Sequence, residues 1–158
     1  MKHIVLAISL IISFQCRGQI TFINENTPWE TLSKTARKER KLIFIHLESS
    51  ECEQCNEVAT QGFKGVALRD IFQKNFIAVR SNVTSENGKK LAEKFHIKGA
   101  LVSLFVDADG NVLNRYNGST SYSKAYLESA QVALGRKGDK KITDFEKEYQ
   151  EGERSAAF

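Results

Sequence analysis

The sequence has no apolar run long enough to cross a lipid bilayer. Its longest run, from Ile4 to Phe14, falls short of the ~20 apolar residues that a membrane helix needs. Lys2 stands before the run, and small and polar residues follow it, which is the layout of a secretory signal. We therefore expect residues 1–18 to be a signal peptide that is cleaved after Gly18, and the mature chain to be exported.

Cys16 offers a second use of this N-terminus, as the anchor of a lipoprotein. Ser13, Phe14 and Gln15 match poorly the box of small residues that lipoprotein processing requires. We therefore treat an anchor at Cys16 as a minor alternative. Contact with a membrane is expected only if the N-terminus is retained or carries a lipid.

The chain also lacks the features of proteins that bind nucleic acids or nucleotides. Loss of Lys2 and Arg17 with the signal would leave 21 basic residues against 19 acidic ones, so the formal net charge would fall from +4 to +2. The basic residues are scattered along helical segments without the interleaved aromatic residues on which bases stack. There is no glycine-rich loop to cradle phosphates and no flavin or nicotinamide site. We expect no nucleic-acid partner and no cofactor.

Cysteine is scarce, with three residues, of which Cys16 would leave with the signal. The other two, Cys52 and Cys55, form a C-x-x-C pair in the stretch ESSECEQCNEVATQGF, residues 48–63. Outside the cytosol such a pair can be oxidised and remain so. Taken alone, the pair is compatible with a redox couple, a structural disulfide or half of a metal site.

A metal site would use Cys52 and Cys55 with His46 as a third ligand. A closed zinc site has four ligands, usually from a second cysteine pair, and this chain has no second C-x-x-C. Metal binding is therefore the weaker of the alternatives.

The hydrophobic pattern alternates between strands and helices along the chain. Continuous apolar runs are typical of strands buried on both faces, whereas apolar residues at i, i+3, i+4 and i+7 indicate amphipathic helices. DADGN, residues 107–111, is a strong turn signal between two strands. The pattern predicts helices over residues 29–41, 55–62, 66–75, 85–95 and 121–134, and strands over residues 42–47, 76–83, 100–106 and 112–116. This order predicts an α/β domain with a central mixed sheet flanked by helices.

Composition changes after residue 134. Residues 135–141 form a charged linker, and the segment that follows carries Ile142, Phe145 and Tyr149 on one helical face. We expect a domain at residues 19–134, followed at 135–158 by the linker and a short C-terminal helix that must dock on something to be stable.

Several of these segments together carry a family likeness. KLIFIHLESSECEQC, FIAVRSNV and KFHIKGALVSLFVDADGNVL, with the last amphipathic helix, resemble an exported bacterial thioredoxin-like protein from about Trp29 to Leu134. The resemblance implies a thioredoxin-like fold, a periplasmic or secreted location and a part in cell redox homeostasis. The tail FEKEYQEGERSAAF resembles the start of a helical extension found in longer relatives, which implies a truncated C-terminal extension.

The resemblance also assigns roles to particular residues. His46, six residues before Cys52, stands where the family commonly carries a buried acid that moves protons for the resolving cysteine, so a proton relay is implied. The alternative is a core histidine that is satisfied by hydrogen bonding. Leu101 stands where the family places a cis-proline opposite the cysteines. We expect a trans peptide between Ala100 and Leu101, and a reshaped substrate groove at these two residues.

A C-x-x-C pair at the start of a helix divides the chemistry between its two sulfurs. The helix dipole favours a thiolate on Cys52, the attacking group, and Cys55 would resolve the mixed disulfide. Nearby carboxylates at residues 48, 51, 53 and 57 oppose a second negative charge and favour the disulfide form.

The sequence therefore predicts a thiol:disulfide oxidoreductase, acting as a reductant or weak exchanger on protein or small-molecule disulfides. An external dithiol must supply its electrons, because the chain has no electron-carrying cofactor site. The alternatives are a redox-inactive interaction module with a structural disulfide and, less favoured, a Cys/His metal-binding protein.

Overall fold

The computed structural model describes residues 18–137. The predicted signal peptide falls almost wholly outside this range, and so does the predicted C-terminal helix. None of the helices within residues 18–137 has the length and apolar character needed to span a membrane. The elements, in chain order, are β1 (Phe22–Ile23), α1 (Trp29–Glu39), β2 (Leu42–Glu48), α2 (Glu53–Gly62), α3 (Val66–Asn75), β3 (Phe76–Asn82), α4 (Glu86–Lys94), β4 (Val102–Val106), β5 (Val112–Asn117) and α5 (Ser123–Gly135).

The five strands form one mixed sheet in the order β1-β3-β2-β4-β5. β1, β3 and β2 run parallel, whereas β4 and β5 are antiparallel to their neighbours. The predicted α/β class and mixed sheet are confirmed. β1 was not predicted, because two residues are too few to show a period.

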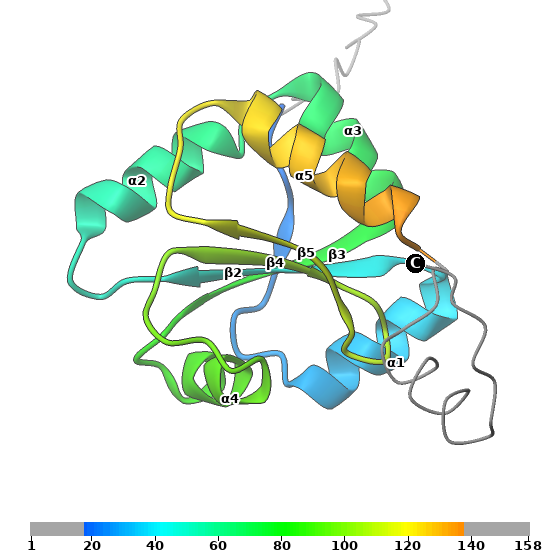
Figure 1. The fold of residues 1–158 in the computed structure, drawn as a ribbon, viewed down its shortest axis with the longest axis horizontal. Helices are drawn as coiled ribbons and strands as arrows, with labels where there is room; N and C mark the ends of the chain where they lie inside the picture. The colour runs from blue at the N-terminus through cyan, green and yellow to red at the C-terminus, as the bar shows by residue number, and fades with distance from the viewer. Residues whose placement is uncertain (1–17, 138–158) are drawn as a thin grey trace, which may run out of the picture.

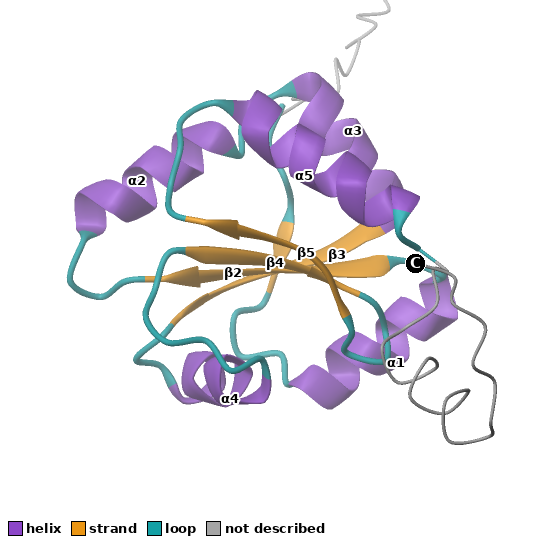
Figure 2. Cartoon of the chain, in the orientation of Figure 1, coloured by secondary structure: helices purple, strands orange, loops and turns teal. Residues whose placement is uncertain are grey.

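Helices cover both faces of the sheet, as Figures 1 and 2 show, with α2, α3 and α5 on one side and α1 and α4 on the other. Because side chains alternate along a strand, β2 supplies Phe44 to the first face and Ile43, Ile45 and Leu47 to the second. We call the face under α2, α3 and α5 the aromatic face, since its core is built from Phe44, Phe63, Phe72, Phe76, Phe105 and Tyr126. The opposite, aliphatic face is built mainly from Leu32, Ile43, Ile45, Leu47, Val79, Leu91 and Leu104.

Gly62 lets α2 lie close to the rest of the aromatic face. A Cβ atom at this position would overlap the carbonyl oxygen of Thr120 and the ring of Tyr126. Only glycine therefore fits where the last turn of α2 contacts α5 and the segment that precedes α5.

The two cysteines lie just past the carboxyl end of the central strand, β2. β2 and β3 are parallel and in register, so Glu48 and Asn82 end side by side. Residues 49–51 continue from the end of β2 and lead directly into Cys52 and α2. The start of α2 therefore lies at the carboxyl edge of the parallel strands, which is where ligands bind in many α/β folds.

Candidate active site

Cys52 and Cys55 form a disulfide whose Cα atoms are 5.2 Å apart. Cys52 is the N-cap residue of α2, and its sulfur accepts a hydrogen bond of 3.3 Å from the backbone N–H of Cys55. The prediction that the pair stands at a helix N-terminus is confirmed. Both residues are half-buried, so the structure does not divide them into an exposed and a sealed sulfur.

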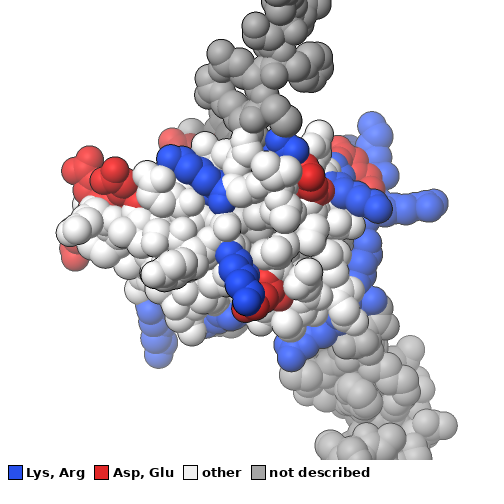
Figure 3. Space-filling view, turned by 90° about the horizontal axis from the view of Figure 1, so that it is seen from above, with Lys and Arg blue, Asp and Glu red and all other residues white. Residues whose placement is uncertain are grey.

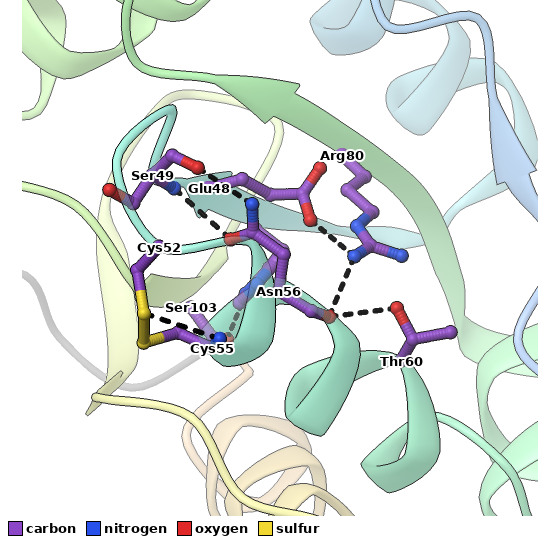
Figure 4. A network of polar contacts seen from close by, with 9 residues as sticks. Glu48, Ser49, Cys52, Cys55, Asn56, Thr60, Arg80 and Ser103 are labelled. Carbon is purple, nitrogen blue, oxygen red and sulfur yellow. Dashed lines mark hydrogen bonds and ion pairs between the residues drawn. A yellow bond between two sulfur atoms is a disulfide. The ribbon is translucent and has the colours of Figure 1, made fainter.

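A polar network ties the start of α2 to the sheet (Figure 4). The guanidinium of Arg80, on β3, donates to the carboxylate of Glu48 at the end of β2 and, at 3.0 Å, to the backbone oxygen of Asn56 on α2. The side chain of Asn56 in turn bonds the backbone of Ser49 twice, at 3.2 Å and 2.6 Å. The loop that carries Cys52 is thus anchored to its own helix, and the helix to β3.

This network changes the predicted effect of the nearby carboxylates. Glu48 is paired with Arg80, so its charge is compensated and cannot count fully against a thiolate on Cys52. Glu51, Glu53 and Glu57 are exposed. Figure 3 shows acidic side chains gathered at the end of the molecule where α2 begins. Three carboxylates, rather than four, remain to oppose a thiolate.

His46 lies in the middle of β2 on the aromatic face and is fully buried. Its Nδ1 is 2.9 Å from the hydroxyl of Ser103 on β4, and its ring packs edge-on against Phe63, with centroids 5.0 Å apart. Nε2 has no hydrogen-bond partner among the described residues. The contact of Nδ1 with Ser103 fits a hydrogen-bonded core histidine, whereas the unpartnered Nε2 leaves a nitrogen that a proton relay could use.

Burial, followed by the positive charge of Arg80, lowers the pKa of His46 to about 3. The imidazole is therefore neutral at physiological pH, because burial moves its pKa well below the ordinary value of 6.5. As a neutral ring it can accept a proton only transiently, and it can donate only from its N–H.

Ala100 and Leu101 take different positions. Ala100 lines an open groove of about 470 Å³, together with Ser49, Ser50, Glu51, Lys89 and Gly99. We call this the Ala100 groove; it borders the residues that lead into Cys52. Leu101 does not line it, so of the two predicted groove residues only Ala100 lies there.

Leu101 has a left-handed backbone, with φ of 59°. Its N–H donates to the oxygen of Leu47 at 2.8 Å, and its oxygen accepts from the N–H of Gly118 at 2.6 Å. The predicted trans peptide between Ala100 and Leu101 is confirmed, since residues 18–137 contain no cis peptide bond. With both backbone groups bonded inside the protein, Leu101 braces β2 against the segment after β5.

Sequence reasoning missed Arg80, Asn56 and Ser103. Arg80 and Ser103 pair in register with His46 from the two neighbouring strands, so the three form a polar row across the sheet. The isolated arginine in FIAVRSNV was a visible signal, but its partner depends on strand register, which the sequence does not show. No sequence pattern singled out the contact of Asn56 with Ser49.

Metal binding gains no support from the geometry. Within residues 18–137, no three His, Cys, Asp or Glu side chains gather where they could hold a metal ion. One nitrogen of His46 is already engaged by Ser103.

Comparison with solved structures identifies the fold of this chain. No protein-family model matches the chain, and no curated protein matches its sequence. Among solved structures, a thioredoxin from Thermus thermophilus has a TM-score of 0.60 at 18% identity, covering 70% of this chain and 87% of that one. A candidate disulphide-isomerase from Bacteroides thetaiotaomicron has a TM-score of 0.61 at 20% identity, covering 79% and 98%.

The oxidoreductase DsbH has a TM-score of 0.57 at 15% identity, covering 74% of this chain and 88% of that one. At such identities the likeness concerns the fold. Residues 18–137 therefore have a thioredoxin-like fold, with a C-x-x-C disulfide at the start of α2.

Proposed function

We propose that this protein is a thiol:disulfide oxidoreductase that reduces or exchanges disulfides in exported proteins. The observation that carries the proposal is the position of the disulfide. Cys52 and Cys55 are bonded at the N-terminus of α2, are both partly accessible, and follow directly on residues 49–51, which line the Ala100 groove. A reversible disulfide needs this combination of a polarised helix end and an open approach.

The chemistry requires two thiol–disulfide exchanges. In the reduced protein, the thiolate of Cys52 attacks one sulfur of a substrate disulfide, forms a mixed disulfide and releases the other substrate sulfur as a thiolate. The thiolate of Cys55 then attacks the sulfur of Cys52 and releases the second substrate thiolate, which leaves the Cys52–Cys55 disulfide. Two electrons pass to the substrate, and the protons of the two cysteines end on the released thiols. An external dithiol returns the protein to its reduced form.

Opposing electrostatic effects set the direction of the reaction. The Cys55 N–H and the dipole of α2 stabilise a thiolate on Cys52, and a stable thiolate favours the reduced form. Exposed carboxylates at Glu51, Glu53 and Glu57 destabilise it. The balance favours a reductant or a weak exchanger over a strong oxidant.

His46 is the proposed proton relay for Cys55. It lies on the sheet face that α2 covers, and its Nε2 has no hydrogen-bond partner among the described residues, although its lowered pKa makes the imidazole a weak base. A neutral imidazole can take the proton of the resolving thiol during attack and release it afterwards.

Export of the protein is part of the same proposal. The layout of residues 1–18 supports it, and an oxidising compartment would supply disulfides for the pair to act on. A periplasmic or secreted location follows from this reading, with lipid attachment at Cys16 as the minor alternative.

A second candidate function is a redox-silent interaction module that keeps a structural disulfide. The backbone of Leu101 favours it, because the N–H and the carbonyl of this residue are both used within the protein. They are therefore not free to pair with an extended substrate peptide.

One experiment separates the candidates. The protein is equilibrated in a series of thiol redox buffers, its free thiols are trapped with an alkylating reagent that adds mass, and insulin reduction is assayed for the wild type and Cys52→Ser. A reversible two-electron transition with turnover that Cys52→Ser abolishes supports the oxidoreductase. A transition without turnover identifies the silent module, and stoichiometric zinc or copper in the purified protein would point to a metal carrier.

A further inference from the structure

Asn56 closes a small ring around the cysteine pair. Its side-chain oxygen accepts from the N–H of Ser49 at 3.2 Å, and its side-chain nitrogen donates to the oxygen of Ser49 at 2.6 Å. One amide side chain therefore satisfies both backbone groups of a single residue. The chain between Ser49 and Asn56 contains both cysteines (Figure 4).

Few other bonds hold the loop that leads into Cys52. Among the described residues, the links from residues 49–52 to α2 are the Asn56–Ser49 pair, the bond of Cys55 N–H to the Cys52 sulfur, the bond of Asn56 N–H to the Cys52 oxygen, and the disulfide itself. The bond of Glu51 N–H to the Ser49 hydroxyl is internal to the loop. When the disulfide is reduced, four of these hydrogen bonds remain, and the side chain of Asn56 makes two of them.

The other end of the same residue is fixed to the sheet. The backbone oxygen of Asn56 accepts from Arg80 at 3.0 Å and from the hydroxyl of Thr60 at 2.8 Å. Because Arg80 also pairs with Glu48, the start of α2 is held to β3 and to the end of β2. Asn56 is thus a firm support for the loop that it clamps.

We propose that Asn56 is a positioning residue that holds the sulfur of Cys52 over the N–H of Cys55 when the disulfide is open. The inference rests on the proposed oxidoreductase function. A thiolate gains from this N–H and from the helix end only while it stays in line with them. A loop freed from Ser49 carries Cys52 away, and the thiolate then loses that stabilisation.

The test uses the full chain with Asn56→Ala and follows the ionisation of Cys52 in the reduced protein by its alkylation rate across pH. We expect the pKa of Cys52 to rise by about one unit, which is the scale of one hydrogen bond to a charged group. Below both pKa values the thiolate fraction then falls about tenfold. Each remaining thiolate is about threefold more nucleophilic, so attack on a disulfide slows about threefold.

Above both pKa values the sign reverses, and Asn56→Ala attacks about threefold faster than the wild type. A residue that serves only stability gives no such crossing. Asn87→Ala is the matched control. The side chain of Asn87, in the first turn of α4, also makes two hydrogen bonds to a loop backbone, at 2.6 Å to the oxygen of Glu25 and at 3.1 Å to that of Thr27. Its variant should lose stability without a change in the pKa of Cys52.

Asn56→Gln keeps the amide but moves it by one methylene, so it breaks the pairing with Ser49 and serves if the alanine variant does not fold. An unchanged pKa and pH profile in both variants, while the wild type exchanges disulfides normally, would overturn the role of Asn56 alone. A wild type that fails to exchange disulfides at any pH would instead overturn the proposed function.

Discussion

The two faces of the sheet differ in whether their buried polar groups have hydrogen-bond partners. On the aliphatic face the buried serines are satisfied: the hydroxyl of Ser33 donates to the oxygen of Ala108 at 2.6 Å, and the hydroxyls of Ser81 and Ser85 are 3.2 Å apart. On the aromatic face, Nε2 of His46 and Nε of Arg80 are buried without a partner among the described residues. Both of these groups lie on the face that α2 covers, as does the hydroxyl of Tyr126, which also has no partner among the described residues. The hydroxyl of Ser119, between β5 and α5, is a further such group.

This difference supports the proposal that the aromatic face carries the chemistry of the protein. A buried polar atom without a hydrogen bond costs roughly 1 to 3 kcal/mol, so a face selected only for stability has no reason to keep one. Proteins break such local rules mainly at functional sites. His46 and Arg80 lie in register on β2 and β3 beneath the helix that carries the disulfide, which is where a proton relay and a tether for α2 are useful.

Glycine substitutions on the two faces should have the largest effects on stability. A Cβ atom on Gly62 would overlap Thr120 and Tyr126 on the aromatic face, and one on Gly88 would overlap the oxygen of Asn82 on the other. We expect Gly62→Ala and Gly88→Ala each to lower the free energy of unfolding by about 3 kcal/mol. Denaturant unfolding of the oxidised protein measures both.

Redox behaviour should separate these two variants. Gly62 is in α2, so Gly62→Ala should also shift the thiol–disulfide equilibrium, whereas Gly88→Ala should leave it unchanged. Gly135→Ala is the neutral control, because a Cβ atom there would meet nothing within 4 Å. Equal redox shifts in the first two variants would contradict the assignment of chemistry to one face.

The stability of the protein should depend on pH through His46, on the aromatic face. The folded-state pKa of about 3 lies below the ordinary value of 6.5, so the unfolded chain binds the proton first as the pH falls. The stability that neutral His46 provides is present above pH 6.5 and is lost progressively from there down to about pH 3. Between about pH 7 and about pH 5 we expect a loss of about 2 kcal/mol.

His46→Gln removes the titrating group and keeps a hydrogen-bonding side chain, so its unfolding free energy should fall less over the same range. His96 is exposed, and His96→Gln should follow the wild type. Parallel pH profiles for the wild type and His46→Gln would mean that the imidazole is not held neutral. If His46 is the relay, His46→Gln should also slow the resolving step without slowing the first attack.

The backbone of Leu101 joins the Ala100 groove to β4 and is tested by two substitutions. Proline cannot adopt φ near 59° and has no N–H for Leu47, so Leu101→Pro should lower the unfolding free energy by about 2 kcal/mol. Leu101→Gly accepts the left-handed backbone and keeps the N–H, and should change stability by less than about 1 kcal/mol. Thermal unfolding of the pair checks this. A proline variant as stable as the glycine variant would show that the bond to Leu47 contributes little.

The smallest expected effect concerns the exposed carboxylates at the start of α2. Each acts on Cys52 through solvent, so replacing Glu51, Glu53 and Glu57 together with glutamine should speed attack on an anionic disulfide by only about two- to threefold. High salt should erase the gain. The rate with a cationic disulfide should fall instead, and equal changes for both substrates would argue against an electrostatic origin.

Much of the architecture was predictable because it depends on local patterns. The apolar run of β2, the helical spacing after Cys55 and the DADGN turn each specify their element within a few residues. The short strand β1 has no such pattern. Prediction of the start of β4 was less accurate, because Ala100 and Leu101 belong by composition to the strand but are turned away by the left-handed backbone of Leu101.

The site was only partly predictable, for a physical reason. C-x-x-C fixes its own geometry within one helical turn, so Cys52 and Cys55 could be placed from spacing alone. Arg80 reaches Glu48 and Asn56 across strands, and Asn56 folds back seven residues to Ser49. Such contacts depend on register and on loop path, which no period records. The low pKa of His46 likewise arises from burial, which becomes visible only in three dimensions.

The proposed mechanism depends most on Cys52 being the attacking sulfur and Cys55 the resolving one. Reduced Cys55→Ser and Cys52→Ser are each mixed with a disulfide-bonded protein substrate, and the products are analysed by mass spectrometry without reductant. We predict that Cys55→Ser accumulates a mixed disulfide through Cys52 and that Cys52→Ser forms almost none. Equal adducts on both variants, or none on either, would contradict this division of roles between the two sulfurs.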